Sequence, residues 1–356
     1  MNQNNSPRSA DCYCAGRRSF LTGLLAVGAA GALPGCASTL DSAPATAGRI
    51  DIHHHFFSPT YVKALDEKGL APPIIKNWSI EKTLADMDQA GVATAILSVT
   101  TPQVSFVDAP AAARLARESN EYAAQLGLSH RRRFGSFAML PMQSADGALR
   151  ELEYALDVLK ADGIGLLTSY DGKWLGHPDF APVMVELNRR KAVLYTHPTV
   201  APCCVNLLPK VPPTVVEFGT DTTRTIVDIV FSGTAARSPD THFIFSHAGG
   251  TLPFLTERLL KMPVLDKSLE ARVPNGVLHE LQRFSYDTAW SANRYALPSL
   301  LSLVGTPQVL FGSDFPYRTG ADNVAGLMAF GFSHAEMRAV GRDNAMRLLP
   351  GLRIGG

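Results

Sequence analysis

From Gly48 to the end of the chain, short apolar runs alternate with longer amphipathic stretches. The runs that we predict to be strands are Arg49–Phe56, Ala93–Thr100, Phe134–Leu140, Gly163–Ser169, Ala192–His197, His242–His247, Ser285–Ala289 and Val309–Asp314. Helical stretches between them include Ile80–Ala90, Ala111–Leu126, Asp146–Ala161, Phe180–Arg190, Thr222–Ala236 and Ala321–Phe330. Strands that alternate with helices in this way predict an α/β fold, a single (β/α)8 barrel over residues 48–356.

A doubly wound open sheet is the alternative fold for the same pattern. Such a sheet would normally carry a Gly-rich, phosphate-binding turn after its first strand. At that place this chain has "RIDIHHHFFSP", Arg49 to Pro59, which holds three histidines instead. The barrel is therefore the favoured fold.

Residues 1–47 have the features of an export signal followed by a short linker, so we do not assign them to the barrel. Arg17 and Arg18 precede an apolar run that ends at Leu33, as in a twin-arginine signal. The run is too short to span a bilayer stably. The following "LPGC" resembles a lipobox and favours lipid attachment at Cys36, with cleavage in "SAPATAG" as the alternative. We expect an exported, periplasmic protein.

The composition excludes several classes of partner and site. A formal net charge of +1 over 356 residues gives no basic surface for nucleic acid, and a small molecule is the expected partner. The 5 cysteines contain no CxxC pair and no disulfide framework. Cys203 and Cys204 are adjacent, so they cannot easily form an ordinary bridge, and we interpret them as structural or incidental.

The three histidines of the first strand differ in the direction that they face. Side chains alternate along a strand, so His53 and His55 point to one side and His54 to the other. Other predicted strands end in His197, His247 and Asp314. A lone buried histidine is usually a hydrogen-bonded core residue, but all these strand ends lie on the face where barrel enzymes build active sites. The pattern therefore predicts a metal site.

Several phrases resemble the decarboxylase branch of the amidohydrolase superfamily. They are "DIHHHF", "SHAGGTLPF" and "FGSDFP", and the branch includes 2-amino-3-carboxymuconate-6-semialdehyde decarboxylase and gamma-resorcylate decarboxylase. The phrases "ILSVTTP", "KWLGHPDF", "RRKAVLYTHPT" and "SYDTAW" are most similar to 6-methylsalicylate decarboxylases. The resemblance covers essentially all of the chain after Gly48.

The resemblance implies a role for each of the strand-end residues. One divalent ion, usually zinc and sometimes manganese, would be ligated by His53, His55, His197 and Asp314. His247 would stand free beside it as an acid or base. Relatives with two ions bridge them by a carboxylated lysine or a glutamate at the end of strand four, and "GIGLLTSY" offers neither. Lys173 lies beyond that strand and is interpreted as a surface charge.

The leading functional hypothesis is a metal-dependent, non-oxidative decarboxylase of a small aromatic, salicylate-like acid. Asp314 would deliver a proton to the ring carbon, and His247 would adjust the acidity of Asp314 or position a water molecule. In a second route, His247 would activate a hydroxide that adds to the substrate, and the sequence leaves both routes open. The alternative function is a metal-dependent hydrolase of a lactone or amide. A periplasmic binding protein would not need four ligands and a free histidine.

Three residues are candidates for substrate binding. Arg258 stands at the offset from His247 where relatives place an arginine that crosses a homodimer interface, although a surface arginine on its helix is equally consistent. Asp287 ends strand seven and could line the mouth of the barrel or cap the next helix. Phe315 could wall an aromatic pocket together with Trp290 and Tyr317.

Two further features have structural interpretations. His177 precedes a proline, which is typical of a residue that starts a helix. Gly249 and Gly250 lie two and three residues after His247, and we expect the backbone to approach another segment closely there.

Overall fold

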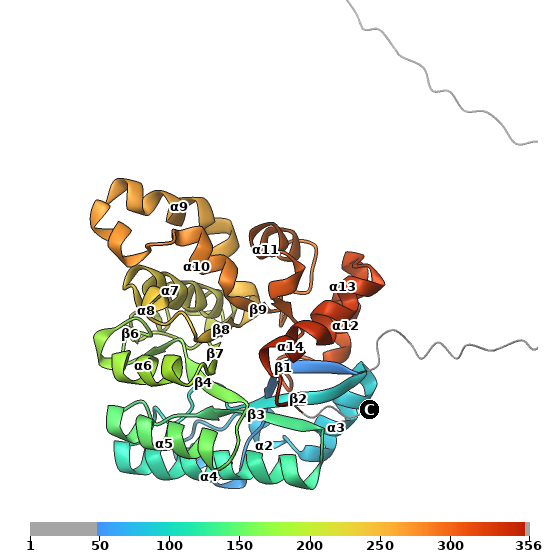
Figure 1. Ribbon diagram of the computed structural model, residues 1–356. Helices are drawn as coiled ribbons and strands as arrows, with labels where there is room; N and C mark the ends of the chain where they lie inside the picture. The colour runs from blue at the N-terminus through green and yellow to red at the C-terminus, as the bar shows by residue number, and fades with distance from the viewer. Residues whose placement is uncertain (1–47, 353–356) are drawn as a thin grey trace, which may run out of the picture. The chain divides into compact units, whose positions relative to one another are not determined.

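The computed structural model describes residues 48–352 and contains one eight-stranded parallel sheet with the order β1-β2-β3-β4-β7-β8-β9-β10. Its strands are β1 Arg49–His55, β2 Val92–Ser98, β3 Phe134–Met139, β4 Gly163–Leu167, β7 Val193–His197, β8 His242–Phe245, β9 Ser285–Asp287 and β10 Val309–Leu310. A two-stranded hairpin, β5 Ser169–Tyr170 and β6 Lys173–Trp174, follows β4. In Figure 1 the strands lie at the centre and the helices surround them.

Helices connect the strands, and extra helices lie in the longer connections. Their bounds are α1 Pro59–Glu67, α2 Pro73–Lys76, α3 Ile80–Ala90, α4 Ala109–Ser129, α5 Ala145–Asp157, α6 Ala181–Arg189, α7 Glu217–Phe231, α8 Thr234–Arg237, α9 Leu252–Leu265, α10 Val277–Arg283, α11 Leu297–Val304, α12 Gly320–Phe330, α13 His334–Arg338 and α14 Asn344–Leu348. Each predicted strand and helix has a counterpart here, so the prediction of a (β/α)8 barrel is confirmed.

The barrel closes between its first strand and the segment that follows β10. The Ile52 N–H donates to the Phe311 carbonyl at 3.1 Å, and the Asp314 N–H donates to the His53 carbonyl at 2.8 Å. The His55 N–H donates to the Phe315 carbonyl at 2.8 Å. The eighth strand was predicted to extend to Asp314, whereas regular pairing with β9 ends at Leu310. The remainder of the predicted strand pairs with β1 instead.

Local sequence explains where some helices begin and end. The Ser79 hydroxyl accepts the Lys82 N–H and starts α3, and Gly91, with φ 65°, ends it directly before β2. Helix α7 begins at Glu217, earlier than the predicted start at Thr222. Its N-cap residue, Val216, makes no side-chain cap hydrogen bond, so the sequence carries no start signal there.

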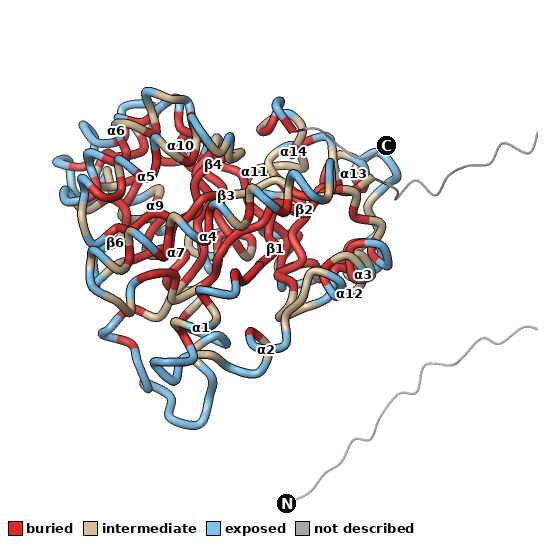
Figure 2. Tube along the Cα trace, turned by 90° about the horizontal axis from the view of Figure 1, so that it is seen from below, coloured by how far each residue is buried: buried red, intermediate tan, exposed pale blue. Residues whose placement is uncertain are grey.

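Two apolar layers hold the barrel together. Residues inside the barrel form one cluster with residues at the end of the chain: Ile50, Ile52, Ile96, Phe137, Val193, Tyr195, Ile244, Leu310, Ala345, Leu349 and Leu352. A larger cluster lies between the outside of the strands and the helices. Figure 2 shows the result, with buried strands at the centre and helices that expose only their outer faces. Helix α14 and the residues after it cover the amino-terminal end of the barrel.

Across residues 48–352, no helix has both the length and the apolar character that crossing a membrane requires. The predicted export signal, the domain boundary at residue 47 and the predicted lipid attachment at Cys36 lie outside the described residues and stay predictions.

Candidate metal centre

An irregularity in β1 brings two consecutive side chains to the inside of the barrel. Asp51 pairs with Ala95 and His54 with Leu97, so β1 carries one more residue than β2 over this interval. Ile52 therefore packs in the interior cluster and His53 also faces inward. The Asp51 carboxylate accepts the N–H groups of His53, at 3.1 Å, and of Ser313, at 3.0 Å. It thereby satisfies backbone groups that the irregular pairing leaves without a partner.

The four residues predicted as ligands lie together at the carboxyl ends of β1 and β7 and after β10. His53, His55, His197 and Asp314 each offer one ligand atom, and these atoms all lie within 4.8 Å of one another. Asp314 Oδ1 lies 3.2 Å from His53 Nε2 and 2.9 Å from His55 Nε2, and the two Nε2 atoms are 3.2 Å apart. All four residues are buried. The sequence thus predicted which residues gather here.

The hydrogen bonds behind the histidines determine which ring nitrogens face the cluster. Nδ1 of His53 donates to Asp287 Oδ2 at 2.9 Å, and Nδ1 of His55 donates to the Ser98 carbonyl at 3.2 Å. Nδ1 of His197 donates to the Pro198 carbonyl at 2.8 Å. Each Nδ1 therefore carries the proton of a neutral ring, so each Nε2 presents a lone pair, which is the arrangement of metal-binding histidines.

The donor set fits one divalent ion. Ligand atoms about 2.0–2.2 Å from a tetrahedral ion are roughly 3.3–3.5 Å apart. The ligand atoms of His53, His55 and Asp314 are 2.9–3.2 Å apart, and that of His197 lies within 4.8 Å of them. Two imidazole lone pairs that face each other at 3.2 Å repel unless a cation or a proton lies between them. We therefore regard this buried group of three histidines and one aspartate as able to hold a metal ion.

Charges in the cluster alter the pKa values of its members in opposite directions. Burial alone would lower the pKa of His53, but the carboxylates of Asp287 and Asp314 raise it to about 10. Burial lowers the pKa of His55 and places that of His197 well below its ordinary value. Burial opposes ionisation of Asp314, yet the positive charge of His53 holds its pKa well below the usual range. Beyond the protons on the three Nδ1 atoms, the metal-free cluster thus carries one further proton at neutral pH, on His53.

His247 lies beside the four-residue cluster and is not part of it. Its ring centroid is 4.9 Å from that of His53, and its Nδ1 donates to the Ala289 carbonyl at 3.1 Å. Among the described residues no hydrogen-bond partner is found for its Nε2. Burial, followed by the charge of His53, lowers the pKa of His247, so the ring is neutral at pH 7. These features suit an acid or base that works through Nε2.

The glycines after His247 allow the turn that holds this histidine. Gly250 has φ 67°, and a Cβ atom there would lie 1.9 Å from the Gly219 carbonyl oxygen on α7. No side chain can be accommodated at such a distance, so the expected close backbone approach is confirmed. His247 itself has φ 53°, and its N–H is accepted by Asp287 Oδ1 at 3.0 Å. The turn therefore depends on both the glycines and Asp287.

The three predicted substrate-binding residues lie in different surroundings. Asp287 is fully buried, and its two oxygens accept from His53 Nδ1 and from the N–H groups of His247 and Ala289. These bonds favour a role in orienting His53 and the turn at His247. Phe315 stacks on His54, with ring centroids 4.8 Å apart. Arg258 is exposed on α9. The roles of Phe315 and Arg258 in binding stay predictions.

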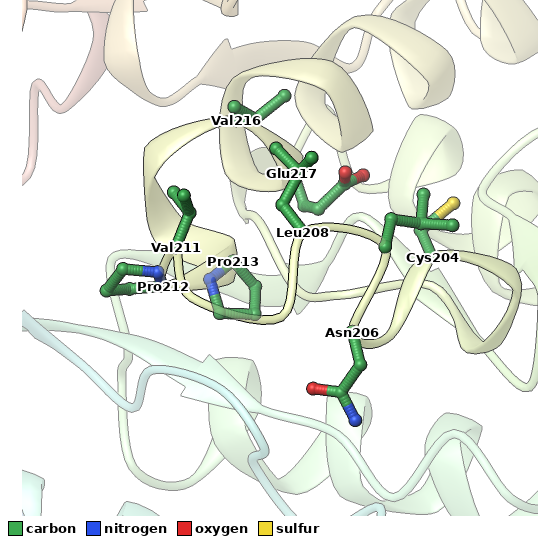
Figure 3. A pocket seen from close by; sticks show the side chains of 9 residues that line it. Cys204, Asn206, Leu208, Val211, Pro212, Pro213, Val216 and Glu217 are labelled. Carbon is green, nitrogen blue, oxygen red and sulfur yellow. The ribbon is translucent and has the colours of Figure 1, made fainter.

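The residues interpreted as structural behave accordingly. The His177 side chain accepts the Asp179 N–H at 3.2 Å at the start of a short 3-10 helix. Lys173 forms an ion pair with Asp179 at 2.6 Å, and both side chains are exposed. Cys203 and Cys204 are free thiols. Figure 3 shows Cys204 in the loop between β7 and α7, beside a cavity of about 10 Å³, which has room for about one water molecule.

Sequence reasoning missed the hydrogen bond that Trp290 makes. Its indole Nε1–H donates to Asp314 Oδ2 at 2.7 Å, so one carboxylate oxygen faces the histidines and the other is held by the indole. The rings of Phe218 and Tyr317 lie 5.9 Å from those of His197 and His55, respectively. The sequence places Trp290 and Tyr317 near strand ends, but nothing local in it indicates which polar atom each would contact.

Comparison with known proteins relates the whole barrel to one family. The family model described as Amidohydrolase matches residues 50–351. The chain is 40% identical to the decarboxylase yanB of Aspergillus niger over 322 residues, which cover 85% of this chain and 87% of that protein. It is 35% identical to the 6-methylsalicylic acid decarboxylase acuB of Aspergillus aculeatus over 323 residues, 86% of this chain and 97% of that protein.

A solved structure with the same fold is a dihydroxybenzoic acid decarboxylase from Polaromonas with bound manganese and the inhibitor 2-nitroresorcinol. The TM-score is 0.74 at 22% identity, and the match covers 86% of this chain and 98% of that protein. At this identity the likeness shows the fold alone.

Proposed function

Because the chain belongs to the amidohydrolase family, we propose that it is a metal-dependent, non-oxidative decarboxylase of a small, salicylate-like aromatic acid. The observation that carries this proposal is the buried cluster of His53, His55, His197 and Asp314 in a chain whose curated relatives are decarboxylases. The name of one relative specifies 6-methylsalicylic acid, a salicylate, as the acid on which that protein acts.

The proposed cofactor is one divalent ion held by His53, His55, His197 and Asp314. Three nitrogen donors and one carboxylate suit zinc, and we propose zinc with manganese as the alternative. Such an ion, when bound, orients the substrate and stabilises negative charge that develops on it. Asp287 and the carbonyl groups of Ser98 and Pro198 support it indirectly, because they fix the rings of the three histidines.

The proton that the reaction needs would be relayed from solvent by this chain's own residues. Decarboxylation forms a bond between a proton and the ring carbon and breaks the bond to the carboxylate carbon, whose electron pair stays on the ring as carbon dioxide leaves. We assign proton delivery to Asp314, which faces the histidines through Oδ1. Because Asp314 is ionised and His247 is neutral at rest, the proton first enters from solvent at His247 Nε2, since Nδ1–H is held by the Ala289 carbonyl. His247 then passes the proton to Asp314 or to a water molecule that it positions.

The proposal is tested by carbon dioxide release from a panel of salicylates and related aromatic acids. Protein loaded with zinc or manganese is compared with chelator-treated protein, with His247→Ala and with His279→Ala, which removes an exposed histidine on α10. We expect release that needs both metal and His247 and that is unchanged in His279→Ala. If no acid releases carbon dioxide while lactones or amides are hydrolysed, the protein is a hydrolase of the same family and the proposal fails.

We also propose that residues 1–47 direct export and that Cys36 carries a lipid. The support is the paired arginines, the apolar run and the "LPGC" motif of the sequence. Mass spectrometry of the mature amino terminus distinguishes a lipidated cysteine from cleavage in "SAPATAG". A homodimer with Arg258 at its interface is likewise a proposal, for which sedimentation of the metal-loaded protein and of Arg258→Glu is the test.

A further inference from the structure

Arg318 lies in the turn that follows Asp314, four residues after this member of the candidate metal centre. The N–H groups of Tyr317 and Arg318 donate to the Asp314 carbonyl at 2.8 and 3.2 Å, so this turn wraps around a member of the cluster. The Arg318 side chain is partly buried. Its guanidinium carbon lies 5.4 Å from the centre of the Trp290 ring. Arg318 is therefore a cation at the rim of the site, held against an aromatic face.

Trp290 connects this cation to the metal centre. The indole N–H donates to Asp314 Oδ2, and yet the side chain is 54% exposed. One edge of the ring therefore reaches the buried cluster while much of the rest faces solvent. Its backbone has φ 57°, a conformation unusual for a bulky residue, which indicates that the surrounding loop fixes the ring in this place.

The charge of Arg318 has no acidic partner in the described part of the protein. Many other arginines do have one: Arg117 bonds Glu151, Arg190 bonds Glu186 and Arg283 bonds Glu280. For Arg318, no hydrogen bond or ion pair of the guanidinium is found among residues 48–352 beyond its contact with the Trp290 ring. An aromatic face orients the guanidinium without neutralising it, so all its N–H donors stay available to an anion.

We propose that Arg318 binds the carboxylate of the incoming aromatic acid and that Trp290 positions both Arg318 and Asp314 for it. The proposal rests on the proposed function, because it assumes a substrate that carries a carboxylate. A forked guanidinium can form two parallel hydrogen bonds with a carboxylate. Because Arg318 lies in the turn after Asp314, it would hold the substrate carboxylate near Asp314, where the reacting ring carbon must lie.

The two residues should affect different kinetic constants. The carboxylate is charged in the substrate and becomes neutral carbon dioxide, so Arg318 stabilises the bound substrate at least as strongly as the transition state. Its loss should therefore raise KM and leave kcat almost unchanged. Trp290→Phe keeps an aromatic face for Arg318 but removes the donor to Asp314 Oδ2, so it should lower kcat while substrate affinity is retained.

The test compares equilibrium binding of salicylate and of salicylamide, its uncharged analogue, to metal-loaded protein by calorimetry. The affinity ratio of the two ligands isolates the charge of the carboxylate. We expect Arg318→Met to reduce the preference for salicylate by about 10- to 100-fold, the range of charge-assisted hydrogen bonds, and Arg318→Lys to restore part of it. Thermal unfolding of each variant shows whether it is folded.

Two control variants remove other arginines. Arg294→Met deletes a charge from the neighbouring loop that carries Trp290, where Arg294 lies 4.9 Å from the Tyr295 ring, and should leave the ratio unchanged. Arg258→Met tests the competing candidate on α9. The inference is wrong if Arg318→Met leaves the ratio unchanged, if Arg258→Met alone abolishes it, or if the wild-type protein does not prefer salicylate.

The binding assay also separates this inference from the proposed function. Suppose that the wild-type protein prefers salicylate, that Arg318→Met loses this preference, and that no acid releases carbon dioxide. The inference about Arg318 then stands, and the proposed decarboxylase function is wrong. Suppose instead that the wild-type protein releases carbon dioxide, and that Arg318→Met has an unchanged affinity ratio and an unchanged KM. The proposed decarboxylase function then stands, and the inference about Arg318 is wrong.

Discussion

The two ends of strand β1 lie in different surroundings, although all 7 of its residues are buried. At the amino end, Ile50 packs with apolar residues of other strands and of helix α14. At the carboxyl end, His53 and His55 face Asp314, Asp287 and each other. Burial at the first end removes apolar surface from water, whereas burial at the second brings together carboxylates and histidine lone pairs that a proton or a metal cation must balance.

This contrast shows that residues of the apolar core and residues of the candidate metal centre lie at opposite ends of the same strand. The apolar end is closed by residues of α14 and beyond, so its burial contributes to folding. The polar end costs stability in the metal-free protein because ionisable side chains are buried there and two imidazole Nε2 atoms face each other at 3.2 Å. Substitutions at the two ends should therefore separate the free energy of unfolding from metal content and catalysis.

The largest effect is expected from His55→Ala at the polar end. Loss of one of the four donors should remove the ion, and kcat should fall by at least about 10³-fold, since the ion is worth several kcal/mol of transition-state stabilisation. Carbon dioxide release and metal analysis check this result, and circular dichroism shows whether the barrel is intact. Full activity with a normal metal content in this variant would exclude His55 as a ligand.

At the apolar end, Ile50→Ala should cost about 2–5 kcal/mol of unfolding free energy, because it leaves a cavity in a fully buried cluster. Denaturant unfolding measures this loss. Metal content and kcat per folded molecule should be unchanged, and this is the matched control for His55→Ala on the same strand. A loss of metal without a loss of stability would contradict the division between the two ends.

A smaller effect is expected from Asp287→Asn, which keeps the shape of the side chain but weakens its bond to His53 Nδ1. Such a change behind a ligand typically lowers metal affinity by about 10- to 100-fold. Competition with a chromophoric chelator gives the affinity. If the affinity is retained and only substrate affinity falls, Asp287 is a substrate-binding residue, as the sequence first suggested.

The smallest expected effect is the release of one proton when metal binds at pH 7. His53 has a pKa of about 10 in the metal-free cluster and must lose its proton to become a ligand, whereas His55 and His197 are already neutral. Metal affinity should therefore fall as the pH falls below about 10. Calorimetry in buffers of different ionisation enthalpy counts the protons.

The same pKa gives the sign of a stability effect in the metal-free protein. A raised histidine pKa stabilises the folded state fully below the ordinary value of 6.5, and that contribution is lost as the pH rises through about 10. Asp287→Asn removes one of the carboxylates that raise the pKa, so both the number of protons released and this pH dependence should diminish. Release of no proton by the wild-type protein would contradict the assignment.

Much of the barrel was predictable because its signals are local. Strand and helix periodicities lie within each segment, and Ser79 and Gly91 mark the ends of α3 by their own side-chain chemistry. The strand-end positions of the histidines then implied the metal site, since all parallel strands end on one face. The start of α7 at Glu217 was not predictable, because its cap carries no side-chain signal.

The sequence by itself determined the fold class and which histidines and aspartate would meet. Only the tertiary structure decided how they meet: the irregular pairing at Asp51 turns His53 inward, Asp287 orients it from 234 residues away, and Trp290 joins Arg318 to Asp314. The physical reason is that residue periodicity reports the direction of a side chain within its own strand. Partners on distant strands are set by the register in which the barrel closes, which no single segment encodes.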